Sequence, residues 1–320
     1  MKKKILVTGI TGFAGSHLAN YLLRQGGYAV AGTYISEHSL SNIAAIRKDI
    51  ELTRVDLTDT EKTFEVVEDV KPDLLFHLAA LPAVGESYER PLSTIMNNIA
   101  CELNVLEALR KLDMQSCRML VVSSADVYGR VSTKDIPIDE ETPFNPTNSY
   151  AVSKIAQDML ALQYYSSYHL DIVRARPFNH IGPTQGTGFV VADFAKRIVE
   201  IEKGKKKPVM EVGDLSTKRD FTDVRDIVRA YVLLMEKGKT GHVYNIGSGK
   251  SYKIEDILHT LLSLARVKIT VKTDKRLFRS DDAPDRICNS RKFYAITGWK
   301  PTISIEMTLR DTLEYWRQIV

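Results

Sequence analysis

The sequence predicts an α/β fold whose core is a doubly wound parallel sheet. Apolar, strand-like runs alternate with segments of helical spacing through the first half of the 320 residues. The first of these runs enters a glycine-rich turn that opens the first helix. Strand–helix–strand alternation requires crossovers between parallel strands, and such crossovers place helices on both faces of a sheet.

The individual elements follow from hydrophobic spacing and from the residues that end each run. The apolar run 5–9 ends in a glycine turn, and the helical spacing of 15–26 stops at Gly26 and Gly27. A strand over 73–80 closes in small residues. The other predicted strands are 28–35, 52–57, 118–124, 171–178 and 243–249, and the other predicted helices are 60–70, 92–112 and 150–168.

Composition excludes several classes of function. The net charge is only +4, and the lysine-rich runs 2–4 and 203–207 contain no aromatic residues, so we expect solvated surfaces and no nucleic-acid partner. The three cysteines form no CxxC pair, which predicts a reducing compartment and neither a disulfide framework nor a metal site. The apolar run after the N-terminal lysines is too short for a signal peptide, and no segment is expected to span a membrane. We therefore expect a cytoplasmic protein.

A glycine motif marks the first predicted ligand site. The segment TGITGFAGSHL places Gly9, Gly12 and Gly15 between the first strand and the first helix. Glycines at this spacing permit a tight turn and let backbone N–H groups approach a pyrophosphate at the positive end of the helix. The motif follows a clear strand and opens a clear helix, which is the context that a dinucleotide-binding Rossmann fold requires.

The end of the second strand bears on which dinucleotide binds. A carboxylate there grips the ribose of NAD, whereas an arginine favours the phosphate of NADP. Residues 33–35 are Thr, Tyr and Ile, so neither signal is present. Because no carboxylate repels the phosphate, NADP(H) is favoured and NAD(H) stays possible. Asp56 is a candidate partner of the adenine amino group, or else only a turn cap. Groups that could reach the phosphate are Ser36, His38, Arg47 and Lys48.

A phenol and an amine lie one helical turn apart in the segment NSYAVSKIAQD. Tyr150 and Lys154 are at i and i+4, so their side chains can meet. An ammonium group near a phenol favours the phenolate and is expected to lower its pKa from about 10. Ser124, at the end of a neighbouring predicted strand, could hold a substrate oxygen. Together these three residues predict carbonyl reduction or alcohol oxidation beside a nicotinamide.

Five motifs together resemble the extended short-chain dehydrogenases/reductases that act on nucleotide sugars. They are TGITGFAGSHL (8–18), FHLAA (76–80), SSADVYG (123–129), YAVSK (150–154) and GWKP (298–301). Within that family, the segments 178–202, 217–231 and 243–249 resemble the branch of the GDP-mannose 4,6-dehydratases and GDP-4-keto-6-deoxy-D-mannose reductases. The reductases are the closer match.

The resemblance implies roles for particular residues. Ser124, Tyr150 and Lys154 match the catalytic residues, and Asp126 lies where the dehydratases carry an additional glutamate. It implies cofactor contacts from Gly9, Thr11, Gly12, Phe13, Asp56, Leu57, Leu78, Ala79, Ala80, Asn98, Tyr150, Lys154 and Pro177. It implies contacts with a nucleotide sugar from Ser124, Asp126, Tyr150, Asn179, Val190, Lys196, Arg219, Arg279 and Asp282.

Two positions depart from the family pattern. Cys101 replaces a glycine of the helix that carries Asn98. The family's R-P-x-E reads Arg-Ser-Asp-Asp at 279–282, which leaves the nucleotide base open between guanine and another base.

The expected reaction is the NADPH-dependent reduction of the 4-keto group of a GDP-4-keto-6-deoxyhexose. GDP-4-keto-6-deoxy-D-mannose, reduced to GDP-D-rhamnose, is the type case. The alternatives are a GDP-mannose 4,6-dehydratase or an NDP-sugar 4-epimerase, both with a tightly bound cofactor. Asp126 reaches less far than a glutamate, which disfavours dehydration. A regulator without activity is disfavoured because Ser124, Tyr150 and Lys154 are all present.

The resemblance also implies a division of the chain and an assembly. A dinucleotide-binding domain is expected from 1–178 with 219–249, and a smaller α/β substrate domain from 179–218 with 250–320. A cleft between the two domains is the expected nucleotide-sugar site. The helices 92–112 and 150–168 resemble those that pair subunits in this family, so a homodimer is expected.

Overall fold

The computed structural model describes residues 2–82, 84–278 and 285–320. Its centre is a seven-stranded sheet in the order β10-β6-β5-β4-β1-β2-β3, in which every neighbouring pair is parallel. The predicted doubly wound α/β fold is confirmed. The strands are β1 (Lys3–Thr8), β2 (Tyr28–Tyr34), β3 (Glu51–Arg54), β4 (Leu74–His77), β5 (Arg118–Val122), β6 (Ile172–Pro177) and β10 (Val243–Ile246).

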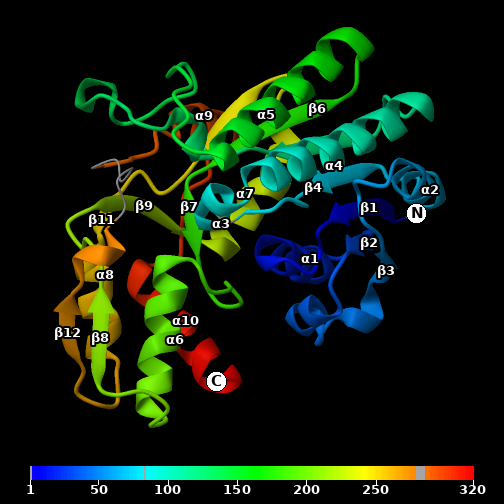
Figure 1. The fold of residues 1–320 in the computed structure, drawn as a ribbon. Coiled ribbons are helices and arrows are strands. Elements are labelled where there is room, and N and C mark those ends of the chain that lie inside the picture. Colours follow the sequence, from blue (N-terminus) through cyan, green and yellow to red (C-terminus); the bar gives the residue numbers. More distant parts are fainter. Residues whose placement is uncertain (1, 83, 279–284) are drawn as a thin grey trace.

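The side chains of β1 alternate between the two faces of the sheet, and the hydrophobic core therefore has two layers. Ile5 and Val7 pack into one hydrophobic cluster, while Leu6 between them packs into the other, as expected when successive side chains of a strand point to opposite faces. One face is covered by α1 (Phe13–Gln25), α7 (Val224–Lys237) and α9 (Arg291–Thr297). The other is covered by α2 (Thr60–Val70), α4 (Pro91–Lys111) and α5 (Ser149–Tyr168) (Figure 1).

The order of the strands fixes where a ligand can bind. The chain runs outward from β1 through β2 to β3, and then returns to the other side of β1 with β4. The loops after β1 and β4 therefore leave the sheet in opposite directions and open a crevice at the carboxyl ends of the strands.

A second part of the chain packs beside this crevice. A three-stranded sheet has the order β11-β9-β7, and a two-stranded sheet pairs β12 with β8. With their helices they enclose a third core that contains Leu258, Leu309 and Leu313 (Figure 1). Its elements are β7 (Asn179–Ile181), α6 (Val190–Glu202), β8 (Val209–Val212), β9 (Lys218–Asp223), β11 (Ser251–Lys253), α8 (Ile254–Ser263), β12 (Thr270–Thr273) and α10 (Ile305–Ile319).

The predicted domain boundaries stay a prediction. The structure adds that β9, which begins at the predicted boundary near residue 219, pairs with β7 and β11 and not with the large sheet. The sequence analysis did not predict α3 (Val84–Glu89) or the short 3₁₀ segments, of which η3 (Ala125–Tyr128) lies in the crevice. Across the described ranges, every helix is too short or too polar to cross a bilayer.

Candidate active site

A cavity of about 1170 Å³ opens at the carboxyl ends of the strands and extends from the glycine turn to α6 and β9. It gathers most of the predicted site residues. Those that line it are Gly9, Thr11, Gly12, Phe13, Asp56, Leu57, Leu78, Ala79, Ala80, Ser124, Asp126, Tyr150, Lys154, Pro177, Asn179, Val190, Lys196 and Arg219. Asn98 is fully buried behind this lining, and Arg279 and Asp282 lie outside the described residues.

The glycine turn has the form that a dinucleotide pyrophosphate needs. Gly9 has a φ of +68°, and a Cβ atom there would lie 3.0 Å from the Ala79 Cα, so β1 and the chain after β4 approach closely. Gly12 is the N-cap of α1 and offers no side-chain cap to the free N–H groups of the first turn. These N–H groups and the helix dipole favour an anion, so the residues present fit a dinucleotide.

The adenosine end of the cavity is formed by the end of β2 and the segment after it. Residues 33–36 and Ser39 line it, whereas His38, Arg47 and Lys48 are not among the described lining residues. The Arg54 side chain, which the sequence analysis did not consider, donates a hydrogen bond of 3.2 Å to the carbonyl of Ile35. Arg54 also lies 3.6 Å from the carboxylate of Glu37 at an exposed position. A cation is therefore present next to the segment that follows β2, although Arg54 itself is not among the described lining residues.

Asp56 has the turn-capping role, one of the two that the sequence left open. Its carboxylate accepts hydrogen bonds from the Thr58 amide (2.9 Å) and the Thr58 hydroxyl (2.8 Å), which caps the turn after β3. The same residue lines the cavity. Contact with the adenine stays a prediction.

Tyr150 and Lys154 lie on the first turns of α5. The helix begins where it does because the side chain of Asn148 caps the Ala151 amide at 2.8 Å. The Lys154 ammonium donates a hydrogen bond of 2.9 Å to the carbonyl of Val122, at the end of β5. It lies 5.9 Å from the centre of the Tyr150 ring. The two side chains therefore occupy the same face, as the spacing predicts.

The expected direction of the phenol's pKa is wrong. Burial raises the pKa of Tyr150, and the carboxylate of Asp126 adds to the rise, while the Ser124 hydroxyl opposes it. Lys154 is not among the groups that shift the pKa of Tyr150, and its ammonium is hydrogen-bonded to a backbone carbonyl. Burial lowers the pKa of Lys154 to about 8. Tyr150 consequently holds its proton at neutral pH, as a proton donor must.

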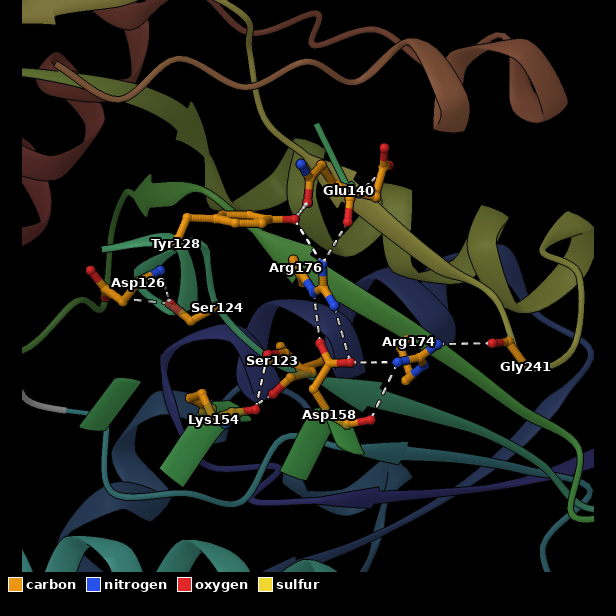
Figure 2. Close-up of polar contacts among 12 residues, drawn as sticks. Ser123, Ser124, Asp126, Tyr128, Glu140, Lys154, Asp158, Arg174, Arg176 and Gly241 are labelled. Atoms are coloured by element: carbon orange, nitrogen blue, oxygen red, sulfur yellow. Dashed lines mark hydrogen bonds and ion pairs between the residues drawn. The ribbon is translucent and has the colours of Figure 1, made fainter. Parts of the chain in front are cut away.

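An ion pair that the sequence analysis missed lies beside Ser124. The Asp126 amide donates to the Ser124 hydroxyl oxygen (3.1 Å), and that hydroxyl donates to the Asp126 carboxylate (3.3 Å), as Figure 2 shows. The guanidinium of Arg286 pairs with the other carboxylate oxygen, and both side chains are mostly buried. No sequence signal marks Arg286, which reaches Asp126 from 160 residues further along the chain.

The segment around Arg286 ties three parts of the chain together. The Arg286 carbonyl accepts a hydrogen bond of 3.1 Å from the Asp220 amide of β9. The carbonyl of Ile287 accepts one of 2.8 Å from Ile138, and the carbonyl of Ile138 accepts one of 2.8 Å from Asn289. Residues 285–289 therefore act as a strap between the loop after η3 and the smaller sheet.

A buried polar network holds α5 against the sheet. The Asp158 carboxylate, one turn beyond Lys154, is fully buried and pairs with Arg174 (2.6 Å) and Arg176 (2.7 Å) of β6. Arg176 also donates to the Tyr128 hydroxyl at 2.9 Å, and this hydroxyl donates to Asn245 of β10 at 2.7 Å (Figure 2). The network holds α5 at a fixed position on β5 and β6, and therefore places Tyr150 and Lys154 opposite Ser124.

Asn98 acts from beneath the cavity. Its side-chain oxygen accepts from the Leu81 amide at 2.7 Å, and its nitrogen donates to the Ser153 hydroxyl at 3.0 Å. It therefore connects the chain after β4 to the turn of α5 that carries Lys154. Its predicted cofactor contact stays a prediction.

The far end of the cavity carries the residues expected to hold a nucleotide sugar. Asn179 begins β7, Val190 and Lys196 lie on α6, and Arg219 lies on β9. Arg219 donates to the Lys218 carbonyl at 2.7 Å. Positive groups on two separate elements thus face one end of the cavity, while the phenol and the serine lie toward the other.

Comparison with known proteins agrees with this geometry. The family model described as GDP-mannose 4,6 dehydratase matches residues 6–312. The chain is 35% identical to a GDP-6-deoxy-D-mannose reductase of Pseudomonas aeruginosa, covering 100% of this chain and 99% of that protein. It superposes with a TM-score of 0.86 on RMD from Pseudomonas aeruginosa complexed with NADPH, at 33% identity and with 100% of both chains covered. The TM-score is 0.87 against a UDP-glucose 4-epimerase of Thermotoga maritima with UDP-glucose, at 28% identity and with 99% of both chains covered. The match over most of the chain confirms the resemblance, and the protein belongs to the GDP-mannose 4,6 dehydratase family.

Proposed function

We propose that the protein uses NADPH to reduce the 4-keto group of a GDP-4-keto-6-deoxyhexose, as in the conversion of GDP-4-keto-6-deoxy-D-mannose to GDP-D-rhamnose. The observation that carries the proposal is a buried Tyr150 beside Ser124, in one cavity with a glycine turn. The 35% identity to a protein named GDP-6-deoxy-D-mannose reductase supports the choice of substrate. The solved relative complexed with NADPH supports the choice of cofactor.

Each residue has a defined task in this reaction. When bound, NADPH supplies a hydride to the carbonyl carbon. With substrate bound, the Ser124 hydroxyl would turn its single O–H from the Asp126 carboxylate to the carbonyl oxygen and stabilise the negative charge that develops there. Tyr150 transfers its phenolic proton to the same oxygen. Lys154, held by Val122, keeps a positive charge near the Tyr150 ring as the phenol loses its proton.

The pair of Arg286 and Asp126 favours reduction over dehydration. A 4,6-dehydratase needs a further acid/base group that can accept a proton from C5 and deliver one to the leaving hydroxyl. The only carboxylate beside Ser124 in the described lining is Asp126, and the Arg286 guanidinium is bound to it. The guanidinium occupies one of the two Asp126 carboxylate oxygens, so that oxygen has no free access to a substrate atom.

The substrate would lie with its diphosphate toward Arg219 and Lys196 and its sugar toward Ser124. Arginine is suited to phosphate because its planar fork donates two parallel hydrogen bonds. We keep Asn179, Val190, Arg279 and Asp282 as proposed substrate contacts. The remaining predicted cofactor contacts, from Gly9 to Pro177, are kept in the same way.

We also propose that two copies associate through α4 and α5, in the cytoplasm. Leu92 and Met96 of α4 expose 73% and 60% of their surface, and Val152 and Met159 of α5 are partly exposed beside them. Apolar side chains grouped on neighbouring helices are typical of a homodimer surface. Sedimentation velocity of the wild type and of a Leu92→Lys, Met96→Lys variant tests this, since the variant should sediment as a monomer.

Two parallel reactions test the activity. Purified protein is mixed with NADPH and either GDP-4-keto-6-deoxymannose or GDP-mannose, and absorbance and product mass are followed. Consumption of NADPH with the keto sugar alone, giving a product two hydrogens heavier, is the expected result. Loss of water from GDP-mannose without net NADPH consumption indicates a dehydratase instead. A C4 epimer formed from an NDP-sugar without added cofactor indicates an epimerase.

A further inference from the structure

A carboxyl group that the proposed mechanism does not use lies inside the contact between α4 and α5. Glu102, in the middle of α4, is fully buried. Neither of its carboxyl oxygens has a hydrogen-bond partner in the described part of the chain. A buried polar group without a partner costs free energy, and a buried carboxylate costs far more than a neutral one. This position therefore calls for a physical explanation.

The residues that face Glu102 identify its environment. Lys154 and Asp158 of α5 act on it electrostatically, and the side chain of Gln157, on the same helix, also lies close to it. Gln157 donates to the Asn98 carbonyl at 2.9 Å, while its own side-chain oxygen is buried without a partner in the described residues. A protonated Glu102 would supply the O–H donor that this oxygen lacks.

Of the ionisable groups around Glu102, Lys154 is the one whose charge Glu102 can affect. Asp158 is already neutralised by Arg174 and Arg176. Cys101, beside Glu102 on α4, and His77 of β4 are both uncharged near neutral pH, because burial raises the pKa of Cys101 to about 12 and lowers that of His77 to about 3. Among the described residues, no carboxylate is paired directly with the Lys154 ammonium. Burial raises the pKa of Glu102 well above its usual range, and Lys154 opposes this rise.

We propose that Glu102 is a positioning residue that acts through Lys154: it stores a proton at neutral pH and, by releasing it as the pH rises, keeps Lys154 charged to higher pH. This inference rests on the proposed function, since it is Lys154 that faces the proton donor Tyr150. At neutral pH the pair is an ammonium ion and a neutral acid. When one proton leaves, the product is a buried ion pair of Glu102 and Lys154, which is stabilised by the low polarity of its surroundings. Without Glu102, the proton lost at this step would come from the Lys154 ammonium and leave it neutral.

The first experiment compares pH profiles of kcat for the wild type, Glu102→Gln and the control Glu107→Gln. Glu107 lies on the same helix, pairs with Arg110 and accepts a hydrogen bond from Tyr164, and it is not among the groups that act on Lys154. Activity that needs a charged Lys154 falls as the pH rises. In Glu102→Gln the midpoint of this fall should move to lower pH by about one unit or more, the size expected for a close opposite charge. In Glu107→Gln it should not move.

An unchanged midpoint in Glu102→Gln overturns the proposal, whatever happens to stability or to the maximal rate. A second measurement needs neither substrate nor turnover. The infrared spectrum of wild-type protein labelled with ¹³C-glutamate should show the carbonyl band of a buried carboxylic acid at neutral pH. This band should vanish on titration to high pH and be missing from Glu102→Met, which replaces Glu102 if the glutamine variant does not fold. A wild type without the band overturns the proposal, whereas a band in a protein that does not reduce the keto sugar refutes only the proposed function.

Discussion

Arg286 and Asp126 form an ion pair inside the cavity, although they are 160 residues apart in the sequence. Through Asp126 this pair also reaches Ser124, whose hydroxyl donates to the same carboxylate. The orientation of the serine that would polarise the substrate carbonyl thus depends on an arginine from the C-terminal part of the chain.

Replacing Arg286 tests this dependence. In Arg286→Leu the carboxylate of Asp126 loses its partner, and Ser124 loses a fixed acceptor. The loss of one charge-assisted interaction is about 1.5–3 kcal/mol, equivalent to roughly 10- to 100-fold in kcat/KM for the keto sugar. Steady-state kinetics measure this, with the exposed Arg310→Leu as control. Equal kinetics in both variants would show that the pair has no catalytic role.

Removal of the phenol should abolish proton transfer without affecting the cofactor. In Tyr150→Phe the ring keeps its packing in α5 but has no proton to give, so kcat should fall by about 10²- to 10⁴-fold. NADPH binding, followed by its fluorescence, should stay close to that of the wild type. Turnover at the wild-type rate would contradict the mechanism.

The pH dependence of the reduction follows from the two shifted groups. Tyr150, whose pKa is raised by burial, keeps its proton across the neutral range. Lys154, whose pKa burial lowers to about 8, is charged below that pH and neutral above it. Both groups are in the required form at lower pH, so kcat should be highest below pH 8 and fall as the pH rises through it. Activity that increases through this range would be inconsistent with the proposed roles.

Gly9 and Gly204 form a matched pair for testing the glycine turn. Their φ angles are +68° and +69°, so alanine imposes similar backbone strain at both, of about 1–2 kcal/mol. Only at Gly9 would the new Cβ meet the backbone of Ala79, at the floor of the cavity. Gly9→Ala should therefore weaken NADPH binding at least tenfold, while Gly204→Ala lowers thermal stability alone. Equal affinities in fluorescence titrations would place the cofactor elsewhere.

The network beneath α5 should be costly to break. Asp158→Asn removes the charge that compensates Arg174 and Arg176, leaving two buried guanidinium groups with one neutral partner. Breaking a buried pair costs about 3–5 kcal/mol in the free energy of unfolding. Urea unfolding measures this, with Asp274→Asn as control, since the Asp274 carboxylate pairs with the exposed Arg276 and caps its amide. A loss below about 1 kcal/mol would mean that the network contributes little.

The sequence predicted the structure correctly where the pattern lies in neighbouring residues. Hydrophobic spacing placed α5 and the central strands to within a few residues, because periodicity is set by each element's own burial. The glycine motif likewise placed the turn at Gly9, where the positive φ and the close approach of β4 require glycine.

Contacts between residues far apart in the sequence, and the depth to which side chains are buried, could not be predicted from the sequence. Nothing near Arg286 in the sequence points to Asp126, because the two meet only after the smaller sheet has packed against the large one. The rise in the pKa of Tyr150 was missed for a related reason. The sequence shows the spacing to Lys154, but not how deeply the phenol is buried or that the ammonium is held by Val122.

The strap of residues 285–289 has a consequence for how the protein is made. Synthesis proceeds from the N-terminus, and domains generally fold as they emerge. The large sheet up to β6 and the residues Ser124, Tyr150 and Lys154 are therefore complete long before Arg286 leaves the ribosome. A nascent chain can form the cofactor's half of the site early, but Asp126 receives its partner only when the final segment arrives. Messages truncated shortly before codon 286 would thus yield chains that hold a dinucleotide yet have an unfinished reaction centre.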